Sequence, residues 1–154
     1  MNLSANFSLH ELTKSETALR MGFDNTPDDE ATENLRILCE KVLQPVRDHF
    51  GKGVKVNSAY RSPESNAAVN GSKTSDHCKG QAADIEIAGI ANADLAQWIM
   101  DNCDYTQLIL EFYTQGIPDS GWVHVSYDPS NLKMQELTAV KVAGKTQYLN
   151  GLHA

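Results

Sequence analysis

The sequence lacks long apolar runs, clustered basic residues and paired cysteine spacings, and each absence argues against a class of protein. Its longest apolar runs are far shorter than the roughly 20 residues that cross a bilayer, so we expect no membrane insertion. The formal charge of -7 at pH 7 disfavours attraction to phosphate, so we expect no nucleic-acid partner. The three cysteines are odd in number and lack CxxC spacing, which argues against a disulfide framework and a cysteine zinc site.

The chain also lacks low-complexity tracts, internal repeats and any break in composition. Its 154 residues suffice for one apolar core, so we predict a single domain over residues 1–154, acting as a monomer. Hydrophobic residues make up 41% of the sequence, which is ordinary for a globular protein. The start, residues 1–6, lacks the basic and apolar blocks of a secretion signal, and we expect a cytoplasmic protein.

Helix signals come mainly in the first part of the chain. Ser8 is a predicted N-cap, and Thr26, followed by Pro27, is another. The helix after Pro27 has one apolar face, and Pro45 should kink it or bound it. The other predicted helices are a short one over residues 64–69, started by Ser62 and Pro63, and an amphipathic one over residues 92–103 capped by Asn92. The helix positions predicted to be core include Leu35, Leu38, Cys39, Val42, Val46 and Cys103.

Strand patterns come mainly in the second part, which favours an α+β fold with N-terminal helices packed on a small, mainly antiparallel sheet. The predicted strands cover residues 54–56, 81–87, 107–112 and 122–127, and a final hairpin surrounds Gly144 and Lys145. The strands over residues 107–112 and 122–127 should form an antiparallel pair. Alternation within residues 81–87 places Asp84 on the face opposite the isoleucines.

Two histidines and one carboxylate form a candidate metal site. His77 and Asp84 close the stretch 75–84, and His124 lies in a distant strand. Catalytic zinc usually takes three protein ligands and keeps a fourth position for water or substrate, so these residues would suit a hydrolase. Gly80 argues against one helix carrying both His77 and Asp84, whereas a loop running into a strand can bring them together. The alternative is that each is an ordinary core or surface residue, since isolated His and Asp are common.

The residues Ser75, His77, Gly80, Ala82 and Asp84, in the pattern S-x-H-x-x-G-x-A-x-D, together with Trp122-Val123-His124, carry a family resemblance. The sequence resembles the zinc D-alanyl-D-alanine carboxypeptidases and the related phage cell-wall endopeptidases, which have the Hedgehog-type zinc peptidase fold. The segments 58–62 and 7–25 are also similar, the second to the phage-type branch. The resemblance covers roughly residues 7–127, and the tail beyond Tyr127 carries none of it.

The resemblance implies that His77, Asp84 and His124 bind Zn²⁺, which would polarise a scissile carbonyl and lower the pKa of water. It also implies that Arg61 holds a substrate carboxylate or carbonyl, a role that its forked, permanently charged guanidinium suits. Ser75 would either hydrogen-bond substrate or stabilise its loop, and Trp122, on the face of His124, is a further candidate substrate contact. Read from the pattern alone, Arg61 would be a surface residue in a turn.

The chain departs from the family pattern at one position. Many relatives place an acidic general base three residues before the last histidine, where this sequence has Gly121. A base is still needed to move a proton from water to the leaving amine. Glu111 is the first candidate because it is an isolated acid in an apolar strand, and Asp119 and Glu86 are the alternatives. Glu111 could also be a strand carboxylate that faces water.

The expected function is hydrolysis of peptide bonds in the stem peptides of bacterial peptidoglycan by a phage-type endolysin that reaches the cell wall after release from the cytoplasm. A D-alanyl-D-alanine carboxypeptidase and a noncatalytic, zinc-stabilised binding or virion module of the same fold are alternatives. A metal-independent glycosidase with paired carboxylates is a weaker one.

Overall fold

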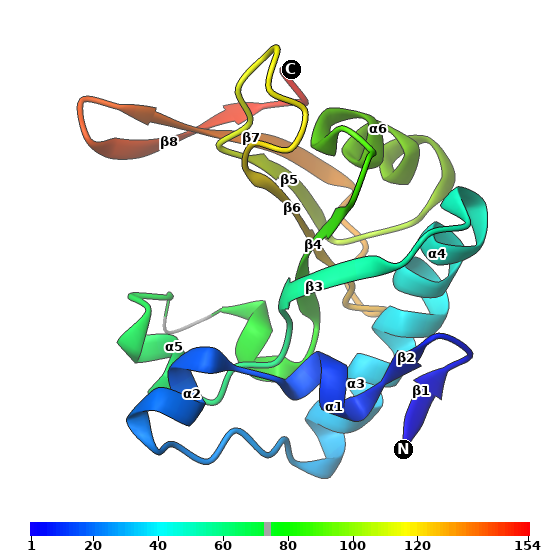
Figure 1. The fold of residues 1–154 in the computed structure, drawn as a ribbon, viewed down its shortest axis with the longest axis vertical. Helices are drawn as coiled ribbons and strands as arrows, with labels where there is room; N and C mark the ends of the chain where they lie inside the picture. Colours follow the sequence, from blue (N-terminus) through cyan, green and yellow to red (C-terminus); the bar gives the residue numbers. More distant parts are fainter. Residues whose placement is uncertain (73–74) are drawn as a thin grey trace.

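The computed structural model describes residues 1–72 and 75–154 and has an α+β architecture (Figure 1). A mixed six-stranded sheet has the strand order β3-β4-β6-β5-β7-β8, and a small antiparallel pair, β1-β2, lies near the N-terminus. The strands are β1 (Asn2–Ser4), β2 (Phe7–Ser8), β3 (Val54–Ser58), β4 (Ala82–Ile87), β5 (Gln107–Glu111), β6 (Trp122–Ser126), β7 (Gln135–Val142) and β8 (Lys145–Asn150). The strand predictions from alternation are therefore confirmed, within a residue or two at the ends.

Strand directions in the large sheet are mainly antiparallel, as predicted, including the β5–β6 pair. The exception is β7, which runs parallel to β5, and no local pattern predicts that pairing. The predicted final hairpin is β7–β8, where Ala143 and Gly144 form the turn with φ of 52° and 79°. Two successive positive φ values suit the tight turns that match the twist of hairpin strands. The hairpin extends the sheet beyond β5.

The first helices start at short polar side chains. In α1 (Leu9–Thr13), the Ser8 hydroxyl accepts a hydrogen bond from the backbone N–H of Glu11, as predicted. Helix α2 (Glu16–Met21), which Ser15 caps, was not predicted. Our N-cap prediction for the next helix was wrong: α3 (Asp29–Leu38) is capped by Asp28, whose carboxylate accepts from Ala31 N–H at 2.8 Å. Thr26 lies before it, with its N–H donated to Asp24.

Pro45 lies at the start of one helical segment and does not interrupt the helical path. A π-helix, η1 (Cys39–Leu43), joins α3 to α4 (Gln44–Phe50), and Pro45 lies in the first turn of α4. Proline has no N–H to donate to the helix. In the wider π turn just before it, hydrogen bonds span five residues instead of four, so Gln44 N–H donates to Cys39 O. The helical path continues to Gly51, whose φ of 63° ends it.

Three more helical segments follow. Helix α5 (Pro63–Ala68) is capped by Ser62, as predicted. A 3₁₀ turn, η2 (Asp76–Lys79), comes before β4, where a loop was expected. Helix α6 (Asn92–Asn102) has Ala91 at its N-cap, so the predicted cap at Asn92 is wrong. The Asn92 amide instead donates to the carbonyls of Ser120 and Gly121, at 2.9 and 3.2 Å, and ties α6 to the start of β6.

The main core lies between one face of the large sheet and the helices α3, η1, α4 and α6 (Figure 1). Leu35 and Leu38 pack there with Ile85 and Val123 from the sheet, and Cys39 and Cys103 are also buried, as predicted. One continuous cluster of buried residues runs from Leu3 to Tyr127, and the single domain over residues 1–154 stays a prediction. The opposite face of the central strands carries polar side chains, including Asp84. Within the described residues, no helix has the length and apolar character needed to cross a bilayer.

We expect Leu35→Ala to lower the free energy of unfolding by about 2–5 kcal/mol, because it leaves a cavity at a position with 0% exposure. Leu19→Ala is the matched control, because Leu19 itself is 85% exposed on α2. This substitution should change the free energy of unfolding by less than about 0.5 kcal/mol. Urea unfolding followed by circular dichroism measures both. Equal effects at the two positions would contradict this assignment of the core.

Candidate metal centre

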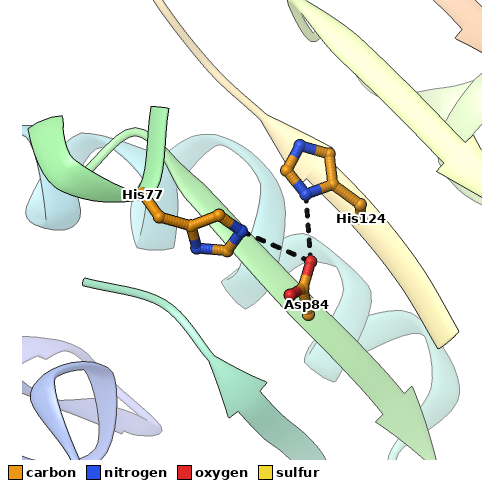
Figure 2. A group of neighbouring side chains, drawn as sticks. All are labelled: His77, Asp84 and His124. Carbon is orange, nitrogen blue, oxygen red and sulfur yellow. Dashed lines mark hydrogen bonds and ion pairs between the residues drawn. The ribbon is translucent and has the colours of Figure 1, made fainter. Parts of the chain in front are cut away.

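Sheet register places two of the predicted ligands side by side. Asp84 on β4 and His124 on β6 are direct cross-strand partners, so their side chains project from the same face. His77 comes from η2 and reaches the same point (Figure 2). Gly80 ends η2 with a φ of 74°, and a Cβ there would overlap the backbone oxygen of Ala31. The chain can therefore turn from η2 toward β4 only because residue 80 has no side chain.

The three side chains fit one metal coordination sphere. Asp84 Oδ1 lies 2.9 Å from His124 Nδ1 and 3.5 Å from His77 Nε2 (Figure 2). One donor atom from each residue lies within 4.8 Å of the others. Ligand atoms at 2.0–2.1 Å from a tetrahedral ion are about 3.3 Å apart, close to both measured distances. The structure thus brings together His77, Asp84 and His124 as predicted, in an arrangement that can hold a divalent ion.

A backbone carbonyl fixes the orientation of the His77 ring. The Nδ1–H of His77 is assigned as the donor to Ala59 O, 2.6 Å away, which points Nε2 toward Asp84. His77 is 3% exposed, so its ring has little freedom to turn. Histidine ligands of metals usually donate their other ring N–H in this way. The Ala59 carbonyl therefore helps to hold the His77 ring in the orientation of a metal ligand.

Charge at the site suits a cation. Burial opposes ionisation of Asp84, but hydrogen bonds from His124 and His77 outweigh it and hold the Asp84 pKa well below its ordinary value. Burial also opposes a charged His124, yet the hydrogen bond and charge of Asp84 raise the His124 pKa. The Asp84 carboxylate is thus ionised at neutral pH, as a metal ligand must be. The 2.9 Å contact between His124 Nδ1 and Asp84 Oδ1 favours the charged form of each group.

Glu111 lies beside this triad. It is paired with Trp122 across β5 and β6, and Trp122 Nε1 donates to its Oε2 at 2.6 Å. Burial, followed by the negative charge of Asp84, raises the Glu111 pKa. Glu111 and His124 line the same pocket, of about 290 Å³. Glu111 is therefore a partly buried acid on the ligand face, and the interpretation of it as a water-facing strand carboxylate does not fit.

The structure gives a physical reason for the departure at Gly121. Its φ is 64°, and a Cβ there would overlap the backbone of Glu111 and Phe112. Phe112 itself has a φ of 56°, which is unusual for a residue with a large side chain. The close approach of the two backbones leaves no room for an acid at residue 121. The carboxylate at this end of the sheet comes from the paired strand, at Glu111.

The alternative bases are placed less suitably. Asp119 is exposed in the connection between β5 and β6 and is not part of the lining of the 290 Å³ pocket. Glu86 shares the face of Asp84, but its carboxylate accepts hydrogen bonds from Asn57 at 2.8 Å and from Asn92 at 3.3 Å. Of the three predicted candidates, Glu111 is the one that lines the same pocket as His124, and its role as the base stays a prediction.

Arg61 borders a second hollow. Its backbone N–H donates to His77 O, and its side chain lines a pocket of about 580 Å³ with Ser58 and Asn57. The buried Arg61 Nε has no hydrogen-bond partner among the described residues. The positive charge of Arg61 also acts to lower the Glu111 pKa, although burial outweighs it. Arg61 thus places a positive charge next to the chain segment that carries His77, and its role as a substrate contact stays a prediction.

Other predicted site residues have structural contacts. The Ser75 hydroxyl accepts from His77 N–H at 3.2 Å and so stabilises its turn, while Ser75 also lines the 290 Å³ pocket. Trp122 orients Glu111, and its role as a substrate contact stays a prediction. Cys78 follows the candidate ligand His77 within η2. Sequence reasoning did not identify Tyr148, which joins the pocket from β8 through the unpredicted parallel pairing of β5 with β7.

Comparison with known proteins agrees with this geometry. A family model described as Peptidase M15 matches residues 5–126. The chain belongs to the peptidase M15 family. M15 peptidases are metallopeptidases, so membership indicates a hydrolase, and all three candidate ligands lie within the match. No curated protein shows a significant match to the chain. The phage-type branch stays a prediction, and the hairpin β7–β8 lies outside the matched residues.

We expect Zn²⁺ to raise the melting temperature of the metal-free protein and His77→Ala to abolish the increase. An ion that binds only the folded state stabilises that state by about 2.7 kcal/mol when the free ion concentration is 100 times the Kd. His10→Ala is the matched control, because His10 is exposed on α1. Differential scanning fluorimetry across a zinc titration measures the shift. The same increase in the His77→Ala protein would show that zinc binds elsewhere.

We also expect Gly121→Ala to lower the free energy of unfolding by more than about 2 kcal/mol, because it adds a backbone overlap to an unfavourable φ. Gly116→Ala separates the two causes, since Gly116 has a φ of 88° but open space around it. Chemical denaturation should show a clearly smaller loss for Gly116→Ala. Equal losses would mean that the close approach to Glu111 does not matter.

Proposed function

We propose that the protein is a zinc-dependent peptidase that hydrolyses peptide bonds in the stem peptides of bacterial peptidoglycan. The main support for the proposal is that the side chains of His77, Asp84 and His124 converge on one point. Glu111 lines the same pocket as His124. Membership of the peptidase M15 family supports the reaction class. The zinc-peptidase pattern around His77 and Asp84 supports the wall substrate.

A divalent ion held by the triad would act as a Lewis acid toward a peptide carbonyl and lower the pKa of water. Glu111 would accept a proton from water at a carboxylate oxygen and pass it to the nitrogen of the leaving amine. Its raised pKa favours this exchange, because a base with a pKa nearer the working pH releases its proton more readily. Trp122 would hold Glu111 in place through the hydrogen bond to Oε2.

Arg61 would bind an oxygen of the substrate from the β3 side of the triad. Its guanidinium lines the 580 Å³ pocket, where its neighbours Ser58 and Asn57 supply further polar groups. Ser58 is the cross-strand partner of Asp84, so this pocket adjoins the candidate metal ligands. A carbonyl or carboxylate there would accept a hydrogen bond from the Arg61 guanidinium.

Hollows on both sides of the triad favour cleavage within a peptide. The 580 Å³ pocket includes residues of β3, and the 290 Å³ pocket includes residues of β5, β6 and β8, His124 among them. Strand β4, which carries Asp84, lies between β3 and β6. A peptide could therefore extend in both directions from the scissile bond. This supports an endopeptidase, as in a phage endolysin, over a carboxypeptidase that removes one terminal D-alanine.

We expect the zinc-loaded protein to release free amines from purified peptidoglycan, and Glu111→Gln to lower the rate by about 10²–10⁴-fold while zinc binding persists. Asp119→Asn is the matched control and should retain the rate, because Asp119 is exposed outside the 290 Å³ pocket. Amine release is followed by a colorimetric assay, and zinc binding by the melting shift. Full activity in Glu111→Gln would refute the assignment of the base.

Mass spectrometry of the products separates the alternatives. Release of D-alanine alone would identify a carboxypeptidase, and new reducing ends that persist in chelator would identify a glycosidase. If zinc-loaded protein cleaves no wall component, the noncatalytic zinc-stabilised module is the correct interpretation.

A further inference from the structure

The hairpin β7–β8 adds a border to the candidate site that the matched family region does not contain. The match ends at residue 126, whereas β7 and β8 extend the sheet next to β5. Figure 1 shows the hairpin on one side of the open sheet face, with α2 and α5 on the other. The hairpin is held to the site at Phe112, whose N–H donates to Ala139 O at 2.9 Å and whose ring lies 5.3 Å from Lys141 Nζ.

Strand register places Tyr148 in line with the candidate base. Trp122 is paired with Glu111, Glu111 with Ala139, and Ala139 with Tyr148, so these four residues form one row across β6, β5, β7 and β8. Directly paired residues project from the same face of a sheet. Tyr148 therefore extends from the face that carries the triad, although it comes from the edge strand.

The small residue between them lets the tyrosine reach the site. Strands two positions apart are separated by about 10 Å, and Ala139, which lies between Glu111 and Tyr148, has only a methyl group. Tyr148 lines the 290 Å³ pocket together with Glu111 and His124. Burial, and then the charge of Glu111, raise the Tyr148 pKa, so its hydroxyl remains a hydrogen-bond donor across the neutral range.

Core packing does not account for Tyr148. Its side chain is 56% exposed, and among the residues that the structure describes its hydroxyl has no hydrogen-bond partner. An aromatic ring with a free donor, at the border of a pocket that holds a candidate base, is suited to contact a ligand. The nearby acids of the pocket, Asp76 and Glu111, carry no donors when ionised. The phenol thus adds a donor for peptide carbonyls on this side.

We propose that Tyr148 binds the peptide substrate, donating a hydrogen bond from its hydroxyl to a backbone carbonyl on the β5 side of the triad. The ring would form the outer wall of the 290 Å³ pocket. This proposal rests on the peptidase function proposed above and assigns a substrate contact to the segment that follows the family match. Substrate selection on this side of the scissile bond would then depend on the hairpin.

The test compares the zinc-loaded full-length protein with its Tyr148→Phe and Tyr148→Ala variants on a soluble stem-peptide dimer. Loss of one hydrogen bond should lower kcat/KM about threefold to tenfold in Tyr148→Phe, and loss of the ring should lower it further in Tyr148→Ala. Gln147→Ala is the matched control, since Gln147 is exposed on the opposite face of β8. Zinc-dependent melting shifts should be the same in all four proteins, which shows that the triad is intact.

Unchanged kcat/KM in both Tyr148 variants, with an active parent protein, would overturn the proposal and leave the peptidase function standing. If the parent protein cleaves nothing, the peptidase function fails, and the affinity for the uncleaved peptide decides the role of Tyr148. Weaker binding by Tyr148→Phe than by Gln147→Ala, measured by calorimetry, would support the contact. Equal binding by the two variants, or no binding by the parent, would overturn it.

Discussion

The candidate site depends on the pairing of Asp84 with His124 across two neighbouring strands. Register is decisive because a shift by one residue would move either side chain to the apolar face. The buried residues that alternate with them, Ile85 and Val123, fix that register, since they must face the helices. Packing of the core thus determines the geometry of the ligands on the other side. The short turn η2 then brings His77 to a place that the sheet has already defined.

Much of this arrangement could be predicted from sequence. Alternation around Asp84 predicted the face on which it lies, and the pattern that links His77 to Asp84 pointed to two candidate ligands, because both signals are local. The N-cap of α3 was misassigned because Thr26 and Asp28 are both suitable caps and only the folded chain selects between them. Asn92 was misassigned for a similar reason, since its amide binds carbonyls of residues that are distant in sequence.

The pairing of strands that are distant in sequence could not be predicted. The parallel register of β5 with β7 depends on packing between distant segments, and it decides that Tyr148 approaches Glu111. The hydrogen bond from Trp122 to Glu111 likewise requires the β5–β6 register. An isolated acid in an apolar strand was the only local signal for Glu111. Its neighbours on the other strands could be named only from the structure.

The contact between Gly121 and the backbone at Glu111 and Phe112 also has an evolutionary consequence. An acid introduced at residue 121 would first disrupt the end of the β5–β6 ladder, so a single substitution could not move the carboxylate from one strand to the other without loss. The backbone at Phe112 would have to relax at the same time. Placement of an acid at residue 121 therefore requires a different backbone path at Phe112 as well as a different side chain.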